Sequence, residues 1–116
     1  MHELSLVHAL FDEADRALGA HPRAAVRELH VRIGELAGVE PELFRTAFED
    51  CHGERGYGGA RLTIVHEPAA WRCRACEATL PPGPLSCPRC ADGGDVHLAA
   101  GDALVLQRIE LEVDDV

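Results

Sequence analysis

The sequence predicts a small α+β protein in which two helices and three strands form one unit and a cysteine-rich module interrupts that unit before the last strand. Apolar residues recur with the period of a helix in two segments and alternate as in strands in three others. Four of the five cysteines fall between residues 68 and 100, where no such periodicity is evident. With 116 residues, the chain has room for one domain and a small satellite.

The first helix is expected over residues 3–18. Leu4, Val7, Leu10 or Phe11, Ala14 and Leu18 follow one another at intervals of three and four residues, and most charged side chains lie between them. Gly19 follows this pattern directly, so we expect the helix to end there.

A strand and a second helix are predicted next. The segment 26–36 (VRELHVRIGEL) alternates apolar and charged residues, which indicates a strand with one face exposed to water. In the segment 39–53, Pro41 occupies a first helical position and Gly53 stands just past the expected end. Leu43, Phe44, Ala47 and Phe48 are expected on one face of this helix.

Two further strands are predicted on either side of the cysteine-rich segment. A glycine-rich turn precedes the strand at about 60–67, and the segment 102–113 (DALVLQRIELEV) alternates in the same manner. Both are expected in one sheet, so the segment between them, 68–100, is an inserted module. We call residues 68–100 the cysteine module.

Two CxxC pairs in the cysteine module predict a metal site. Cys73 and Cys76 form the first pair, and Cys87 and Cys90 form the second. Each pair lets a tight turn aim two sulfur atoms at one point, and two such turns make the tetrahedral thiolate site that zinc prefers. A site with four protein ligands has no open position, so it is structural, and the metal contributes the folding free energy of a module with little core.

Other uses of these cysteines are less consistent with the sequence. Two disulfides are disfavoured in a reducing compartment, and a thioredoxin-like redox site lacks its βαβ context. Iron is the competing metal, and visible absorption would distinguish it from zinc. The module contains about as many acidic residues as arginines and a single aromatic, Trp71, which argues against nucleic acid.

The charge of the whole chain excludes several classes of function. The formal net charge is −9 and the pI is near 5.1, so neither nucleic acid nor an anionic membrane is an expected partner. No lysine is present, which excludes a Walker-type phosphate loop, a Schiff-base enzyme and a lysine base. Acidic residues interrupt the first twenty positions and no apolar run is long enough to span a bilayer, so we expect a cytoplasmic protein.

The first three residues are a candidate chelate for a second metal. The α-amine of Met1, the amide and imidazole of His2 and the amide of Glu3 could form a plane of four nitrogen atoms. Such a plane suits Ni(II) or Cu(II) and not Zn(II). A histidine at position two is also compatible with no metal role, and the other histidines are weaker candidates individually.

Five segments in order resemble the HypA/HybF family of nickel metallochaperones of hydrogenase maturation. They are MHELSL at the start, VRIGELAGVEPELFRTAF at 31–48, GARLTI at 59–64, the two CxxC pairs, and GDALVLQRIELE at 101–112. The resemblance runs across nearly the whole chain. One departure is that Glu77 and Ala91 stand where the family's cysteine turns usually carry glycine, which puts the geometry of these turns in question.

The resemblance implies two helices packed on a three-stranded, mostly antiparallel sheet, with a zinc-ribbon module inserted before the last strand. It implies a nickel-binding domain over 1–67, completed by a strand in 101–116, and a zinc-binding domain over 68–100. Ni(II) would be held by Met1 and His2, with Glu3 close by, and Zn(II) by Cys73, Cys76, Cys87 and Cys90. A GTPase accessory protein and the large subunit of [NiFe]-hydrogenase are the implied partners, and the protein would not be an enzyme.

Two other functions fit parts of the sequence. The chain could be a zinc-ribbon interaction module that carries no nickel. It could instead be an enzyme that uses Cys51 as a nucleophile, with His52 beside it, although a buried apolar role for Cys51 is the simpler interpretation. Glu40 is expected to cap the second helix; the alternatives are a place near the nickel site or on the surface that faces the GTPase.

Overall fold

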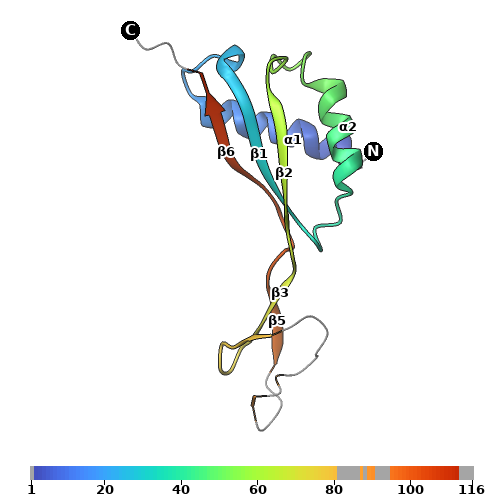
Figure 1. Ribbon diagram of the computed structural model, residues 1–116, viewed down its shortest axis with the longest axis vertical. Coiled ribbons are helices and arrows are strands. Elements are labelled where there is room, and N and C mark those ends of the chain that lie inside the picture. Colours follow the sequence, from blue (N-terminus) through green and yellow to red (C-terminus); the bar gives the residue numbers. More distant parts are fainter. Residues whose placement is uncertain (1, 81–86, 88, 91–94, 113–116) are drawn as a thin grey trace.

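The computed structural model describes residues 2–80, 87, 89–90 and 95–112. These residues form two α-helices and two three-stranded sheets. The molecule is elongated, and the two sheets lie at opposite ends of it (Figure 1). The elements in chain order are α1 (His2–Leu18), the 3₁₀-helix η1 (Arg23–Ala25), β1 (Val26–Gly34), α2 (Pro41–Cys51), β2 (Arg61–Glu67), β3 (Ala70–Cys73), β4 (Thr79–Leu80), β5 (Val96–Ala100) and β6 (Leu104–Leu111).

The main sheet has the strand order β2-β1-β6. β1 pairs antiparallel with β6 and parallel with β2. The parallel pair is possible because α2 provides the crossover between its strands. The second sheet, β4-β3-β5, has antiparallel ladders only, so three of the four ladders among the described residues are antiparallel. The predicted α+β fold with an insertion before the last strand is confirmed.

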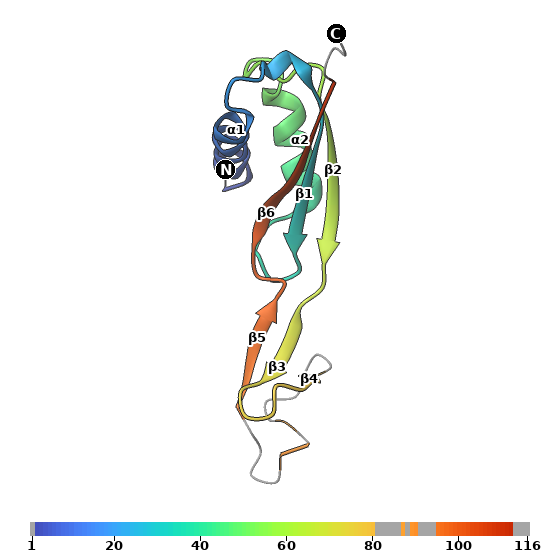
Figure 2. The ribbon, with the colours of Figure 1, turned by 90° about the vertical axis from the view of Figure 1, so that its left-hand side faces the viewer.

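Both helices cover one face of the main sheet (Figure 2). β1 alternates as predicted, so that Leu29, Val31 and Ile33 are buried beneath the helices while its polar residues face outward. The core between them also contains Val7, Leu10, Phe11, Ala14 and Leu18 from α1 and Phe44 and Phe48 from α2.

Two apolar residues predicted to face the core are exposed instead. Leu4 and Leu43 have relative exposures of 36% and 56%. They lie in the first turn of α1 and near the start of α2, where both line a hollow formed by residues of the two helices. Leu10 and Phe11, which the sequence offered as alternatives, are both buried.

Aromatic contacts join the two helices and the loop that follows them. The ring of Phe11 stacks on Phe48 and on Tyr57, with centroid distances of 5.4 and 5.1 Å. The Tyr57 hydroxyl donates a hydrogen bond of 2.6 Å to the Asp15 carboxylate. Burial disfavours the charged form of Asp15, but this bond and the ion pair with Arg23 outweigh it and lower the pKa of Asp15.

A tight junction joins the main sheet to the cysteine module. A Cβ atom added at Gly34 would lie 2.3 Å from the backbone of Gly101, and Gly101 itself has φ of 94° beside Ala69. The Glu35 carboxylate accepts a hydrogen bond from the Ala69 amide at 2.8 Å, and the Glu67 carboxylate accepts one from Gly101 at 3.1 Å. These contacts hold the connection between β2 and β3 against the turn after β1 and the connection between β5 and β6.

The cysteine module contains more regular structure than its sequence predicted. β3 pairs with both β4 and β5, and Trp71 lies opposite Leu80 and Leu98. The apolar periodicity of these strands is weak because each is short and most of their residues are only partly buried.

Candidate metal centres

The four predicted cysteines lie together at the end of the cysteine module. Cys73 is the last residue of β3, and Cys76 follows in the adjoining turn. The Sγ atoms of Cys73 and Cys90 are 3.6 Å apart, and those of Cys76 and Cys87 are 3.7 Å apart. A tetrahedral zinc site with Zn–S bonds of about 2.3 Å requires sulfur separations of about 3.8 Å. The cluster therefore has the spacing that zinc needs.

Backbone amides and neighbouring sulfur atoms control the protonation of this cluster. Hydrogen bonds from the amides of Cys76 and Ala75 lower the pKa of the Cys73 thiol to about 7. The pKa of Cys90 rises to about 12, because its proton is shared with the sulfur atoms of Cys73 and Cys76. One thiolate forms readily, whereas a second thiolate beside it is unfavourable without a cation, so the cluster is suited to a divalent metal.

The apolar core around the cysteines is very small. Among the described residues of this module, only Cys73, Leu80 and Cys87 are buried, with Trp71, Cys90 and Val96 packed against them. Three of these six side chains are cysteines of the cluster itself. The described side chains offset only a small part of the conformational entropy of this module, so a metal bound to the cysteines would add to the stability of its fold.

The turn after the first CxxC pair keeps the geometry of a glycine turn without a glycine. Glu77 has φ of 60°, and its amide donates a hydrogen bond to the Cys73 carbonyl at 2.9 Å. Within the described part of the chain it is the only residue other than glycine with positive φ. Glu77 therefore adopts the left-handed conformation that favours glycine, although it carries a Cβ atom. Ala91, the corresponding residue after the second CxxC pair, lies outside the described residues.

The N-terminal candidates lie on the first turn of α1, which begins at His2. Met1 lies outside the described residues. His2 is exposed and Glu3 is half-buried. The backbone amides at this end of the helix have no partner four residues earlier in the chain, so they are free for other interactions.

The Glu3 carboxylate links the starts of the two helices. It accepts a hydrogen bond from the Glu40 amide at 3.4 Å, and Glu40 is the N-cap residue of α2. Hydrogen bonds from its own amide and from Glu40 lower the pKa of Glu3, so this carboxylate is charged at neutral pH. Glu40 occupies the expected N-cap position of α2, without a side-chain capping bond, and its amide lies beside the Glu3 carboxylate.

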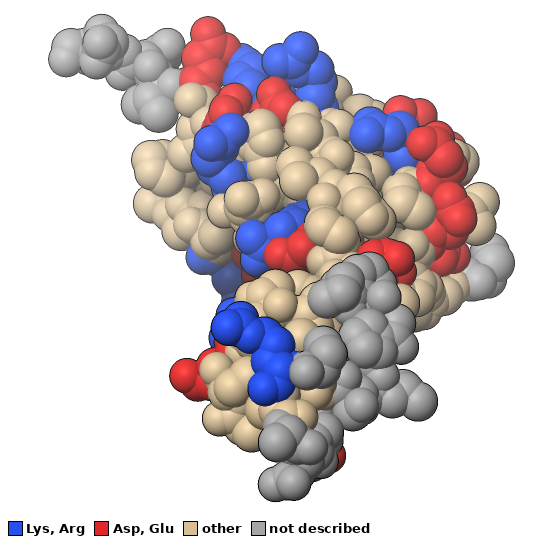
Figure 3. Space-filling model, turned by 60° about the horizontal axis from the view of Figure 1, so that its bottom comes forward, with Lys and Arg blue, Asp and Glu red and all other residues tan. Residues whose placement is uncertain are grey.

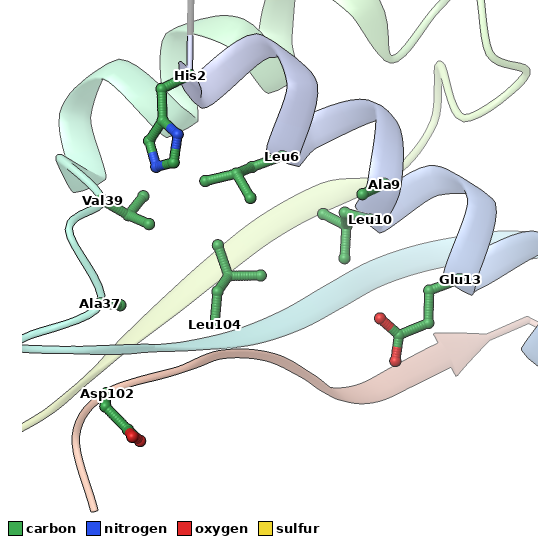
Figure 4. Close-up of a pocket in the computed structure, with 9 residues that line it drawn as sticks. All are labelled: His2, Leu6, Ala9, Leu10, Glu13, Ala37, Val39, Asp102 and Leu104. Carbon is green, nitrogen blue, oxygen red and sulfur yellow. The ribbon is translucent and has the colours of Figure 1, made fainter.

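The His2 imidazole stands at one end of a shallow hollow between α1 and the main sheet (Figure 4). Leu6, Val39 and Leu104 form its apolar lining, while Glu13 and Asp102 lie farther along it. The ring is therefore supported by apolar side chains on one side and open to solvent on the other. This placement leaves His2 accessible to a metal and to another protein.

Cys51 lies apart from the cysteine cluster, at the end of α2. It is partly buried against the helical core. The neighbouring His52 ring stacks on Phe48, and its Nδ1 atom is 3.0 Å from the Tyr57 carbonyl oxygen. This hydrogen bond uses one ring nitrogen of His52 for structure, so the geometry supports a packing role for Cys51 better than nucleophilic catalysis.

The charges of the described residues are mixed on the face drawn in Figure 3. Most of the arginine side chains coloured there lie near acidic ones, and the coloured residues form no broad basic patch. No helix in the described part of the chain is long and apolar enough to cross a membrane.

Comparisons with known proteins agree with this arrangement. The family model described as "HypA: Hydrogenase/urease nickel incorporation, metallochaperone, hypA" matches residues 1–111. The hydrogenase maturation factors HypA of Shewanella halifaxensis and Rhodopseudomonas palustris are 35% and 36% identical, over 97% and 98% of this chain and 98% and 100% of theirs.

Two solved structures share the fold. The solution structure of the Ni metallochaperone HypA from Helicobacter pylori matches with a TM-score of 0.70 and 25% identity, and covers 97% of this chain and 98% of its own. A second solution structure, of a HypA protein, matches with a TM-score of 0.77 and 26% identity over 98% of both chains.

Proposed function

Because the chain belongs to the HypA family of nickel-incorporation metallochaperones, we propose that it binds Ni(II) at its N-terminus and delivers it to the large subunit of [NiFe]-hydrogenase. The observation that carries this proposal is the position of His2 and Glu3 on the exposed first turn of α1, at the start of the chain. The role is that of a carrier and not of an enzyme.

The proposed nickel ligands are the α-amine of Met1, the amide and imidazole of His2 and the amide of Glu3. Four nitrogen atoms in a plane suit Ni(II), which favours square-planar nitrogen ligation. The Glu3 carboxylate would lie beside this plane and keep negative charge near the ion. A planar chelate at an exposed end is open from both sides, so a receiving protein could replace its ligands one at a time.

We assign Zn(II) to Cys73, Cys76, Cys87 and Cys90, with a structural role. The two sulfur separations of 3.6 and 3.7 Å and the small surrounding core support this assignment. Bound there, zinc would neutralise the thiolates and hold the two turns together. The protein would then consist of a nickel-binding domain (1–67 with the strand in 101–116) and a zinc-binding domain (68–100).

A GTPase accessory protein of nickel insertion and the hydrogenase large subunit are the proposed partners, in the cytoplasm. The apolar hollow beside His2 supports transfer to a protein, because a partner could cover Leu6 and Val39 while it approaches the nickel ligands. The acidic net charge and the mixed surface charges support neither nucleic acid nor an anionic membrane as a partner.

The experiment is a Ni(II) titration of the native chain, of His2→Ala and of a chain with one residue added before Met1. Either change removes a proposed ligand, and we expect Ni(II) affinity to fall at least about tenfold, as for other losses at metal sites. His21→Ala, which changes an exposed histidine beyond the end of α1, is the matched control and should bind Ni(II) as the native chain does.

Zinc content and thermal unfolding should be unchanged in all of these proteins, since the altered residues lie on the first turn or outside α1. Native Ni(II) affinity in both His2→Ala and the extended chain would contradict the proposed chelate. It would instead favour a zinc-ribbon interaction module that carries no nickel.

A further inference from the structure

The helices leave one face of the main sheet uncovered (Figures 1 and 2). The alternation of β1 places a second group of potential metal ligands on that face, opposite the buried Leu29 and Val31. Glu28 and His30 are two residues apart on β1 and so point to the same face. Glu110 stands opposite Glu28 on β6. The Nε2 atom of His30 is 3.1 Å from a Glu110 oxygen and 3.5 Å from a Glu28 oxygen.

The surrounding structure holds these side chains in place. The side chains of His30 and Glu28 have relative exposures of only 14% and 15%. Glu28 accepts a hydrogen bond from the Thr63 hydroxyl and forms an ion pair with Arg61 at 3.3 Å. Next to His30, the register of β1 with β6 shifts between His30 and Val31, so the regular alternation of the pair is interrupted beside the group.

One proton cannot satisfy this arrangement. If Nε2 of His30 carries a hydrogen atom, that hydrogen can be donated fully to only one of the two carboxylates, and if it does not, the exposed Arg108 guanidinium is the donor that Nε2 meets, at 3.4 Å. A dication interacts favourably with all three atoms. Ligand atoms bonded at about 2.0–2.1 Å lie about 2.9–3.4 Å apart in tetrahedral or octahedral sites, and the distances from Nε2 are already 3.1 and 3.5 Å.

We propose that Glu28, His30 and Glu110 form a binding site for a divalent first-row transition metal, of the class of Zn(II) or Ni(II). One imidazole and two carboxylates are ligands that such ions accept, and the remaining positions would be taken by water. The site lies on β1 and β6, away from both the cysteine cluster and the first turn of α1, and does not depend on either.

Arg108 is the competitor of the metal at this site. One of its guanidinium nitrogens is 3.4 Å from Nε2 of His30 and 3.2 Å from the Glu110 carboxylate. Its side chain is 63% exposed, so it can turn into solvent at little cost when a metal binds. The competition gives the site a distinctive property: removal of Arg108 should strengthen metal binding, whereas removal of any ligand should weaken it.

The test is a titration of the zinc-loaded full chain with Ni(II) alone and with Zn(II) alone, followed by calorimetry. His30→Gln should weaken one binding event at least about tenfold, and Glu110→Gln should do the same. Glu110 is 48% exposed, so the second variant leaves the fold intact even if the first does not. His66→Gln, on β2 of the same sheet but outside the group, is the matched control and should keep this event.

Three further measurements complete the test. Arg108→Gln should bind the metal several-fold more tightly than the native chain. His2→Ala should retain the His30-dependent event, which separates this site from the N-terminal chelate. Paramagnetic broadening of the His30 imidazole signals by Ni(II) should be present in His2→Ala. An unchanged titration in both His30→Gln and Glu110→Gln would overturn the proposal, as would weaker metal binding in Arg108→Gln.

Discussion

Glu77→Gly should strengthen zinc binding by the cysteine module. The backbone of Glu77 is left-handed, with φ of 60°, in the turn that directs Cys73 and Cys76 toward the other two cysteines. A residue with a Cβ atom pays about 1–2 kcal/mol for this conformation, and glycine pays almost nothing. Glycine also makes the unfolded chain more flexible, which costs about 0.5–1 kcal/mol. The net effect is a stabilisation of about 0.5–1 kcal/mol.

This stabilisation should be visible as zinc affinity. If zinc binding is coupled to folding of the module, as its small described core leads us to expect, free energy gained in the folded turn adds to the free energy of zinc binding. A gain of about 0.5–1 kcal/mol corresponds to about two- to five-fold tighter binding. Competition with a chromophoric chelator at neutral pH measures this difference, with the native chain and the variant titrated side by side.

Glu77→Ala is the matched control, because it removes the same exposed carboxylate but keeps the Cβ atom and its cost. We expect Glu77→Ala to bind zinc about as tightly as the native chain. If Glu77→Gly binds zinc no more tightly than Glu77→Ala, the backbone of this turn is not strained in the way the φ angle indicates, and the reasoning fails.

Three other outcomes follow from the structure. Cys76→Ser should weaken zinc binding by about 10²–10³-fold in the chelator assay, because a structural site worth about 10–16 kcal/mol loses one of its four thiolates. Cys51→Ser should leave zinc content unchanged in the same assay. Gly101→Ala should destabilise the protein by about 2 kcal/mol or more, a loss that thermal unfolding can measure. The φ of 94° at Gly101 is unfavourable for alanine, and the added Cβ atom would lie 2.7 Å from the Cα atom of Ala69. Tyr57→Phe should cost about 1–2 kcal/mol at pH 7 in urea unfolding. The pKa of Asp15 is lowered in the folded state, so its hydrogen bond with Tyr57 stabilises the protein fully at pH values above the ordinary pKa of 3.8. This stabilisation is lost as the pH falls below 3.8, and the difference in unfolding free energy between the native chain and Tyr57→Phe should therefore shrink at pH 3. An equal difference at both pH values would show that the Asp15 charge is not involved.

The periodic elements could be predicted from the sequence because each of them buries one face. The two helices and the three strands of the main sheet are found within one or two residues of their expected bounds. Leu4 and Leu43 show the limit of this method: periodicity predicts the apolar residues of a helix but not which of them the rest of the protein covers. The short strands of the cysteine module were missed for a related reason, because strands of two to five residues carry too little alternation to detect.

The parallel pairing of β1 with β2 and the left-handed turn at Glu77 could not be read from the sequence. The parallel pairing depends on contacts between distant residues. Local preference opposes the left-handed turn, since glutamate rarely adopts positive φ. The same is true of the contact between Glu3 and the amide of Glu40, 37 residues away, which brings the starts of the two helices together.

The sequence by itself determined the ligands whose geometry is local: CxxC turns direct two sulfur atoms to one point wherever they occur, and residues 1–3 are adjacent by covalent connection. Only the tertiary structure decided which distant groups meet. It brought the Sγ atom of Cys73 within 3.6 Å of the Sγ atom of Cys90. Through the pairing of β6 with β1 it also placed Glu110 beside His30, which lies 80 residues earlier in the chain. Strand register and side-chain direction are set by packing of the whole sheet, and no short stretch of sequence contains that information.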